Sequence, residues 1–397
     1  PTRRSSDLNI SEKDKKHSSL SENYIIEKFK NNNILIAVRV RPLNSSEKED
    51  SDYKTIKITS NDSLTISIPT EYSLEQKNKI NHIQIKKEKA AKYHYDFVFG
   101  ENSSQSKVYK TTTYNLLTKV LEGYNATIFA YGATGTGKTY TMVGDKTNLG
   151  IMIRAIKDLF ALVEGMKSEE KNFNIKISYI EIYNEIIKDL LVDNNNKINN
   201  KPTQLEIRTD AQKGVVLQGA SFKKVTNEAD AYKLIMRGNK HRTEKSTMSN
   251  QNSSRSHAML QIYLEVEQPN NNDNVNNLSL NKEKTFGKFV LVDLAGSEKA
   301  PIFGKKTNES GSINKSLLAL GKCINALTSA NKGYIPWRDS KLTRLLQEPL
   351  SGNSRIVMIA TVSPAIDAFD ETMFTLQNAN KAKGVKVVLK KNVVDNE

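Results

Sequence analysis

The chain has 397 residues, of which 37% are hydrophobic, and carries a net charge of +15. A single cysteine excludes an intramolecular disulfide and no apolar run is long enough to span a membrane, so we expect a cytoplasmic protein in a reducing compartment. The positive charge favours an acidic partner, and composition alone leaves nucleic acid, anionic membrane and an acidic protein polymer open.

The first 32 residues are polar and charged, and we expect them to form a disordered arm. A short amphipathic helix around Leu20 to Phe29 is the alternative. A strand is predicted at 34–42, where it ends at a proline. Between Lys77 and Lys92 six lysines accompany a single acid, which indicates a solvated loop or a surface for an acidic partner.

The most specific motif is a glycine-rich loop between a predicted strand and a helix. Gly132-Ala133-Thr134-Gly135-Thr136-Gly137-Lys138-Thr139 fits the phosphate-loop pattern, and it follows the apolar stretch Ala126 to Tyr131. Backbone N–H groups of such a loop cradle phosphate oxygens. We expect Lys138 to reach the β- and γ-phosphates and the Thr139 hydroxyl to ligate Mg²⁺.

Helix and strand patterns alternate along the rest of the chain. Helices are predicted at 106–122, 151–163, 228–239, 312–330, 341–350 and 370–383, and strands at 173–183, 259–266, 286–294 and 354–362. This alternation predicts one large α/β domain of the P-loop NTPase type. Its central sheet is expected to be mixed but mostly parallel, with helices on both faces.

A second nucleotide motif is predicted at Asp293-Leu294-Ala295-Gly296-Ser297-Glu298, which follows an apolar strand. An acid at this strand end is where an aspartate holds Mg²⁺ through water, so Asp293 is the candidate. Gly296, without a side chain, lets its N–H approach a γ-phosphate. An ordinary turn acid is the alternative for Asp293.

A third candidate segment is the dense polar run from Asn250 to His257. Its residues Ser253, Ser254 and Arg255 could ligate Mg²⁺, orient water and contact the γ-phosphate. Arg255 and Glu298 have opposite charge and could close over the nucleotide as a latch. Two loops that both sense the γ-phosphate would form a bistable switch.

With these segments the chain resembles a kinesin motor domain over about residues 34 to 392. The matching segments, in family order, are Arg39-Val40-Arg41-Pro42, the phosphate loop with Tyr140-Thr141-Met142, Ser253-Ser254-Arg255-Ser256-His257, Asp293 to Glu298, Ile313-Asn314-Lys315-Ser316-Leu317 and Ile335 to Leu346. The resemblance implies the kinesin motor fold and a microtubule-stimulated ATPase that uses ATP and Mg²⁺.

The resemblance also implies roles for single residues around the nucleotide. Arg39, Pro42 and Tyr140 would flank adenine, although the family often has histidine where Tyr140 stands. Ser253 and Ser254 would lie near the γ-phosphate and Mg²⁺. Glu298 would pair with Arg255 and help to relay the proton of the attacking water.

Microtubule contacts follow from the same resemblance. The helix from about Ser312 would dock on tubulin, whose acidic surface suits basic side chains. The tubulin-binding candidates are Lys305, Lys306, Lys315, Arg338, Lys341 and Arg344. The tail from Gly384 matches the neck linker, with Val385 as an apolar anchor and Asn392 as the latch asparagine. We expect this tail to dock with ATP and to be released with ADP.

The expected organisation is a disordered arm at 1–32, a motor domain at 33–383 and a neck linker at 384–397. Gly132 to Gly135, the basic segment before Tyr93 and the tail are most similar to the kinesin-8 class, which moves toward plus ends and often shortens microtubules there. The asparagine-rich insertions resemble proteins of protists. We expect a monomeric fragment of a protein that dimerises through a coiled coil outside it, on cytoplasmic microtubules of the spindle or axoneme.

The chain departs from the kinesin family pattern at two places. The family's usual Tyr-Ala-Asn is Asn378-Ala379-Asn380 here, and 299–308 lacks the usual sequence.

Two other function classes are alternatives to a microtubule motor. The first alternative is a nucleic-acid-stimulated P-loop ATPase, against which no aromatic and basic stacking platform is visible. The second is a microtubule-binding protein with weak hydrolysis, which the intact nucleotide motifs oppose. We expect neither nucleic acid nor membrane as a partner.

Overall fold

The computed structural model describes residues 22–30, 34–50, 53–68, 90–166, 171–192, 205–210, 214–244, 252–269, 282–298, 308–330, 333–386 and 388–394. The chain divides into two compact units, 1–31 and 32–397. In the first, helix α1 covers Glu22–Lys30. The described part of the expected disordered arm is therefore helical, as in the alternative interpretation, and the rest of that arm lies outside the described residues.

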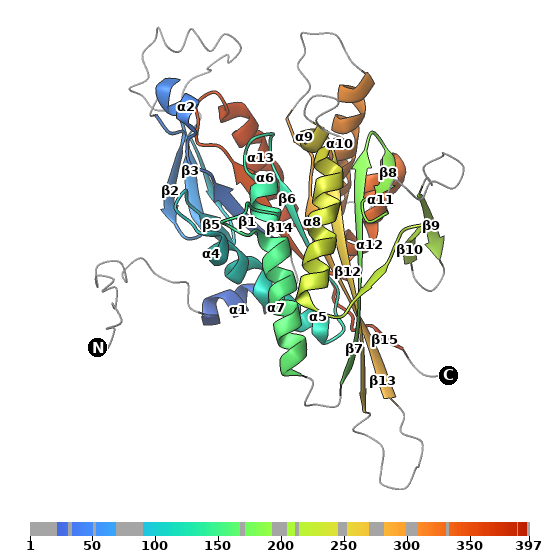
Figure 1. The fold of residues 1–397 in the computed structure, drawn as a ribbon. Coiled ribbons are helices and arrows are strands. Elements are labelled where there is room, and N and C mark those ends of the chain that lie inside the picture. Colours follow the sequence, from blue (N-terminus) through green and yellow to red (C-terminus); the bar gives the residue numbers. More distant parts are fainter. Residues whose placement is uncertain are drawn as a thin grey trace, which may run out of the picture. The chain divides into compact units, whose positions relative to one another are not determined.

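The second unit is built on a ten-stranded sheet that contains the predicted strands (Figure 1). Its main path runs β11-β7-β12-β13-β6-β14-β1-β5, while β8 pairs with β7 and β15 with β13. The bounds are β1 Leu35–Val40, β5 Phe97–Phe99, β6 Ala126–Tyr131, β7 Asn172–Tyr183, β8 Ile186–Asp189, β11 Lys223–Val225, β12 His257–Pro269, β13 Lys282–Asp293, β14 Arg355–Val362 and β15 Val393–Val394.

The sheet is mixed, as expected, but the expectation of a mostly parallel sheet holds for one half only. Strands β13, β6, β14, β1 and β5 pair in parallel. The other half is antiparallel, because β12 and β13 form a long hairpin and β7 pairs with β12 on its far side. Two strands that run in opposite directions can follow one another directly, without a crossover helix.

Two small sheets and the helices complete the unit. The small sheets join β2 (Ile56–Ser60), β3 (Ser63–Ile66) and β4 (Ala91–His94), and β9 (Glu206–Asp210) and β10 (Gly214–Gln218). The helices are α2 Ser45–Asp50, α4 Gln105–Tyr109, a π-helix Lys110–Tyr114, α5 Asn115–Leu121, α6 Lys138–Met142, α7 Ile151–Gly165, α8 Glu228–Glu244, α9 Asn252–Arg255, α10 Asn308–Thr328, a 3₁₀ turn Trp337–Asp339, α11 Lys341–Leu345, α12 Gln347–Leu350 and α13 Phe369–Ala382.

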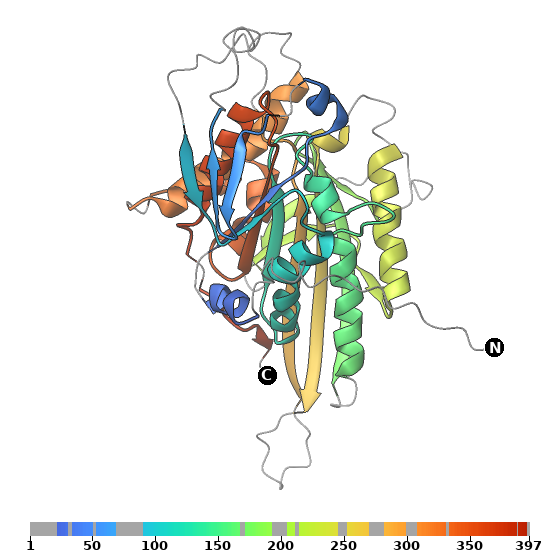
Figure 2. The same ribbon diagram turned by 90° about the vertical axis from the view of Figure 1, so that its left-hand side faces the viewer.

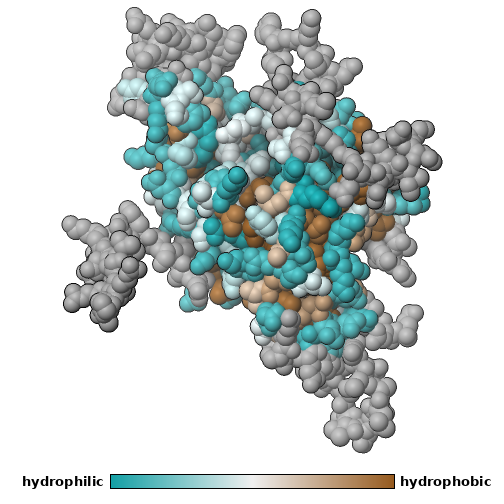
Figure 3. Space-filling view, in the orientation of Figure 1, coloured by the Kyte–Doolittle hydropathy of each residue, from teal (hydrophilic) through white to brown (hydrophobic). Residues whose placement is uncertain are grey.

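Helices cover both faces of the central sheet. Figures 1 and 2 show α7 and α8 on one face, with α10 and α13 on the other. All residues of β1 and β6 are buried, as expected for parallel strands that are covered on both sides. The described surface in Figure 3 is largely hydrophilic, with hydrophobic residues gathered near its centre. The sheet therefore forms the core of the unit, and the predicted nucleotide motifs follow the ends of its strands β6 and β13.

Candidate nucleotide site

The phosphate loop connects β6 to α6, as its pattern predicts, and packs closely against β14. Gly132 has a φ of 158°, and a Cβ added there would lie 2.2 Å from the carbonyl oxygen of Thr361. Only glycine allows this approach. The Thr136 hydroxyl contacts the Thr361 hydroxyl at 2.7 Å. The first turn of the loop is thus fixed to the neighbouring strand.

Lys138 lies inside the phosphate loop. Its side chain is buried, and Nζ donates to the carbonyls of Gly132 at 2.9 Å and Ala133 at 2.7 Å. Burial lowers the pKa of this ammonium, while the negative charges of Asp293 and Glu298 oppose that shift. The loop therefore holds a positive charge at the position where the motif places phosphate.

Asp293 ends β13 beside the phosphate loop, at the predicted position. The Thr139 hydroxyl donates to its Oδ2 at 2.7 Å, and Arg242 Nη1 donates to the same oxygen at 2.6 Å. Arg242 comes from the last turn of α8 and also donates to the Ser256 carbonyl at 3.0 Å. Sequence reasoning missed Arg242, because no motif marks it and the ion pair spans 51 positions.

The oxygen atoms here fit the predicted Mg²⁺. Asp293 Oδ1 is buried and has no hydrogen-bond partner among the residues that the structure describes, and the Thr139 hydroxyl lies against the other oxygen of the same carboxylate. An unpaired buried carboxylate oxygen is costly unless a cation or water approaches it. Mg²⁺ takes oxygen ligands and keeps several waters. The Thr139 hydroxyl and the Asp293 carboxylate are oxygen donors of this kind, and Ser254 as a further ligand stays a prediction.

The phosphate loop and the two candidate switch loops, at Ser254 and at Gly296, meet around Glu298. Gly296 N donates to the Ser254 carbonyl at 2.8 Å, so this N–H, predicted to approach a γ-phosphate, joins the two candidate switch loops. Thr134 donates to Glu298 through its N–H at 2.8 Å and through its hydroxyl. A Cβ on Gly296 would lie 2.3 Å from both Thr134 Oγ1 and Glu298 Oε2. A side chain at this position would therefore displace the Glu298 carboxylate or the Thr134 hydroxyl.

Not every predicted member of the switch loops can be placed. The Ser253 side chain and Asn250 lie outside the described residues. Glu298 is held by Thr134, and its ion pair with Arg255 stays a prediction. The Ser254 carbonyl lies at the junction of the loops.

Arg39 and Tyr140, which the resemblance predicts beside adenine, lie together. The Arg39 guanidinium is 5.2 Å from the centre of the Tyr140 ring. Arg39 is buried and donates to Gln105 Oε1 at 2.7 Å, whereas Tyr140 is exposed. Next to Pro42, the Arg41 side chain donates to the Gly135 carbonyl at 2.8 Å. An exposed ring over a fixed guanidinium can stack on a purine.

His257 connects this site to α10. Its Nδ1 accepts from the Ala295 N–H at 3.0 Å, so the neutral ring carries its proton on Nε2, which lies 2.8 Å from Ser316 Oγ. Burial lowers the pKa of His257 to about 3, and the positive charges of Arg242 and Lys138 add to this. The motif contained His257, but its role could not be deduced before the strand end and α10 were placed together.

The predicted tubulin-binding residues divide into three groups. Lys315 on α10 and Arg338 in the 3₁₀ turn are exposed. Lys341 and Arg344 on α11 are partly buried, and Arg344 Nη2 donates to the Ile207 carbonyl at 3.2 Å. Lys305 and Lys306 lie outside the described residues. Arg344 therefore also holds α11 to strand β9.

The tail lies along the sheet. Val385 is 1% exposed, and its carbonyl accepts from the Ile34 N–H at 3.1 Å. Asn392 Nδ2 donates to the Gly123 carbonyl, to Asn125 Oδ1 and to the Phe286 carbonyl, each at about 3 Å. The pairing of β15 with β13 continues this contact. The buried valine and the multiply bonded asparagine are the two residues that the sequence suggested as anchor and latch.

Comparison with known proteins gives one consistent result. A family model described as kinesin motor domain matches residues 39–385. Mouse "Kinesin-like protein KIF18A" is 42% identical over 91% of this chain and 40% of its own length, and Arabidopsis thaliana "Kinesin-like protein KIN-8A" is 39% identical over 89% and 46%. A solved KIF14 dimer with AMP-PNP in complex with a microtubule is 34% identical, with a TM-score of 0.79 over 91% of this chain and 96% of that chain. The chain thus spans less than half the length of the curated relatives that it matches.

Proposed function

Because the chain belongs to the kinesin motor domain family, we propose that it is a microtubule-stimulated ATP hydrolase that couples hydrolysis to movement along microtubules. The observation that carries this proposal is the junction of three loops, where Gly296 N bonds the Ser254 carbonyl and Glu298 bonds Thr134. A γ-phosphate at this junction would contact the phosphate loop and both candidate switch loops. Loss of the γ-phosphate would remove its contacts with all three loops at once, as a nucleotide-driven switch requires.

In the proposed reaction, water attacks the γ-phosphorus, the bond to the β-phosphate oxygen breaks, and ADP leaves. Glu298, with Arg255 as its ion-pair partner, takes part in the relay that accepts the proton of this water. Lys138 supplies positive charge to the β- and γ-phosphates. Thr139, Ser254 and, through water, Asp293 would hold Mg²⁺, whose chemistry would be to supply positive charge to the phosphates. Arg39, Pro42 and Tyr140 hold adenine.

Hydrogen bonds connect the nucleotide site to α10, the helix proposed to dock on the microtubule. Ala295, beside Gly296, donates to His257, and His257 contacts Ser316 on α10. Lys315 is the neighbour of Ser316 and is exposed. We assign the microtubule face to Lys315 and Arg338, with Lys341 and Arg344 beside them. A change at the γ-phosphate can thus reach the docking helix through two hydrogen bonds.

The tail is the proposed lever. Burial of one valine side chain stabilises the docked tail by about 1.5–3 kcal/mol, which shifts a two-state equilibrium without locking it. ATP would favour the docked arrangement and ADP the released one. The resemblance to the kinesin-8 class leads us to propose plus-end-directed movement, and shortening of plus ends, as activities of the longer protein.

The proposed setting is the microtubule cytoskeleton of the cytoplasm, in a spindle or axoneme. The longer protein would be a dimer through a coiled coil outside this chain, whereas the chain alone would be monomeric. Among the residues that the structure describes, no helix has the length and apolar character to cross a bilayer.

Cosedimentation with microtubules in different nucleotide states tests this proposal against its alternatives. We expect tight microtubule binding with AMP-PNP and about tenfold weaker microtubule binding with ADP, because the candidate switch loops are connected to α10 by hydrogen bonds. A nucleic-acid-stimulated ATPase would bind microtubules no better than single-stranded DNA at matched salt. A protein without effective hydrolysis would bind equally in ATP and in AMP-PNP. Either result would contradict the proposal.

A further inference from the structure

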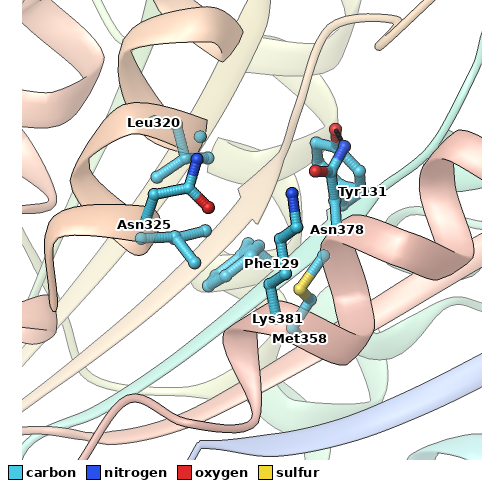
Figure 4. A pocket seen from close by; sticks show the side chains of 9 residues that line it. Phe129, Tyr131, Leu320, Asn325, Met358, Asn378 and Lys381 are labelled. Atoms are coloured by element: carbon cyan, nitrogen blue, oxygen red, sulfur yellow. Dashed lines mark hydrogen bonds between the residues drawn. The ribbon is translucent and has the colours of Figure 1, made fainter. Parts of the chain in front are cut away.

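Asn378 on α13 stands where the kinesin resemblance leads us to expect a tyrosine. Its Nδ2 donates to the hydroxyl of Tyr131 at 3.0 Å. Figure 4 shows the two side chains next to each other at one wall of a small cavity, with Asn325 of α10 on the opposite side. Asn378 of α13 therefore makes a polar contact with strand β6 of the central sheet.

Tyr131 is well placed to connect the phosphate loop with α13. It is the last residue of β6 and directly precedes Gly132, whose carbonyl accepts from Ser297 N at 3.0 Å. Burial raises the pKa of the Tyr131 hydroxyl, while hydrogen bonds to Asn378 and Ser297 oppose the shift. The hydroxyl is thus shared between α13 and the loop that carries Glu298.

Helix α13 leads directly into the tail. It ends at Ala382, whose carbonyl accepts from the Val385 N–H at 3.1 Å, and Val385 is buried. Asn378 lies about two helical turns before Val385. A shift of α13 relative to β6 would therefore move the start of the tail relative to the sheet on which it docks.

We propose that the hydrogen bond from Asn378 to Tyr131 is a positioning contact that holds α13 against the strand of the phosphate loop, so that tail docking follows the state of that loop. The inference rests on the proposed function. Asn378 and Tyr131 act here as positioning residues and take no part in hydrolysis.

The test is a double-mutant cycle with Tyr131→Phe, Asn378→Leu and the double variant. Tyr131→Phe keeps the ring and removes only the hydroxyl, while Asn378→Leu keeps the approximate volume. A spin label beyond Asn392, in a Cys323→Ser background, reports the ratio of docked to released tail with AMP-PNP and with ADP. Basal ATP hydrolysis is measured on the same preparations.

Asn378→Leu should lower the docked-to-released ratio with AMP-PNP about two- to tenfold, the effect of one neutral hydrogen bond, and Tyr131→Phe, which also loses the contact with Ser297, should lower it at least as much. The double variant should lower it no further than Tyr131→Phe alone, because the bond between Asn378 and Tyr131 is lost once. Basal hydrolysis should stay within about twofold of the wild-type rate. The matched control is Asn325→Leu, which changes an asparagine on the other wall of the cavity and should leave the ratio unchanged.

Unchanged ratios in the single variants, or effects that multiply in the double variant, would overturn the positioning role while leaving the motor proposal intact. An equal loss in Asn325→Leu would overturn it as well, since the cavity and not the bond would then matter. A wild-type tail that is equally mobile with AMP-PNP and ADP would instead contradict the lever in the proposed function, and the inference with it.

Discussion

Arg242 Nη1 lies 2.6 Å from Asp293 Oδ2, and these side chains are 5% and 0% exposed. The pair joins the last turn of α8 to the end of β13. The candidate switch loop that contains Ser254 follows α8, and the one that contains Gly296 follows β13. Arg242 also holds the Ser256 carbonyl at 3.0 Å. The buried guanidinium thus fixes the starting points of both loops relative to each other.

Arg242→Met should destabilise the fold by about 3–5 kcal/mol, because Asp293 would remain as a buried charge without its partner. Urea unfolding measures this. The control is Lys119→Met, which breaks an ion pair with Glu122 between two exposed side chains and should change stability by less than about 1 kcal/mol. Equal losses in the two variants would show that the buried pair is not a major support of the site.

His257 should make stability fall with acid below neutral pH. Its pKa is about 3 in the fold and about 6.5 when unfolded, so the unfolded chain binds more protons between these values. This contribution is complete above pH 6.5 and is lost as pH falls. The stability gap between wild type and His257→Gln should therefore shrink by about 2 kcal/mol from pH 7.5 to 5.0.

Urea unfolding at the two pH values measures that gap, and the matched control is His94→Gln at an exposed histidine. A gap between wild type and His257→Gln that stays constant across this range would contradict the neutral, buried ring.

Microtubule affinity should depend on the exposed basic residues near α10. Replacing Lys315 and Arg338 by alanine should weaken binding about two- to thirtyfold at low salt and reduce its salt dependence. Cosedimentation at several salt concentrations measures both effects. Replacing two exposed lysines of β2 and β11, Lys57 and Lys224, removes the same charge elsewhere. If this control weakens binding as much, net charge and not the proposed face determines affinity.

Hydrolysis should depend on Glu298 and Lys138. We expect Glu298→Ala and Lys138→Ala each to lower microtubule-stimulated turnover at least about 100-fold, since one removes a proton-relay group and the other the charge beside the phosphates. Steady-state phosphate release measures this, with Glu122→Ala as the surface control. Turnover within about tenfold of wild type would remove that residue from the mechanism.

Local patterns predicted the parts of the site that depend on neighbours in sequence. The phosphate loop and Asp293 were found because strand, glycine loop and helix follow one another directly. The Arg242 pair and the His257 contact with Ser316 were not, because each joins elements far apart in the chain. The antiparallel half of the sheet, with its hairpin of β12 and β13, was missed for a different reason: an alternation of strands and helices does not give the direction in which two consecutive strands pair.

Val385 and Asn392, which the resemblance suggests as anchor and latch, are buried and multiply bonded respectively, and their roles in the tail stay predictions. It could not foresee what Asn378 does, because this residue departs from the family pattern. Its hydrogen bond to Tyr131 became visible only with α13 and β6 in place.

The most direct test of the motor proposal is the ATP hydrolysis rate measured against microtubule concentration. We predict a rate that rises with polymer and saturates at least about tenfold above the basal rate, because docking through α10 acts on the loops around Glu298. The same titration with single-stranded DNA should leave the rate at its basal value. A rate that is flat with microtubules, or that rises equally with DNA, would contradict the account.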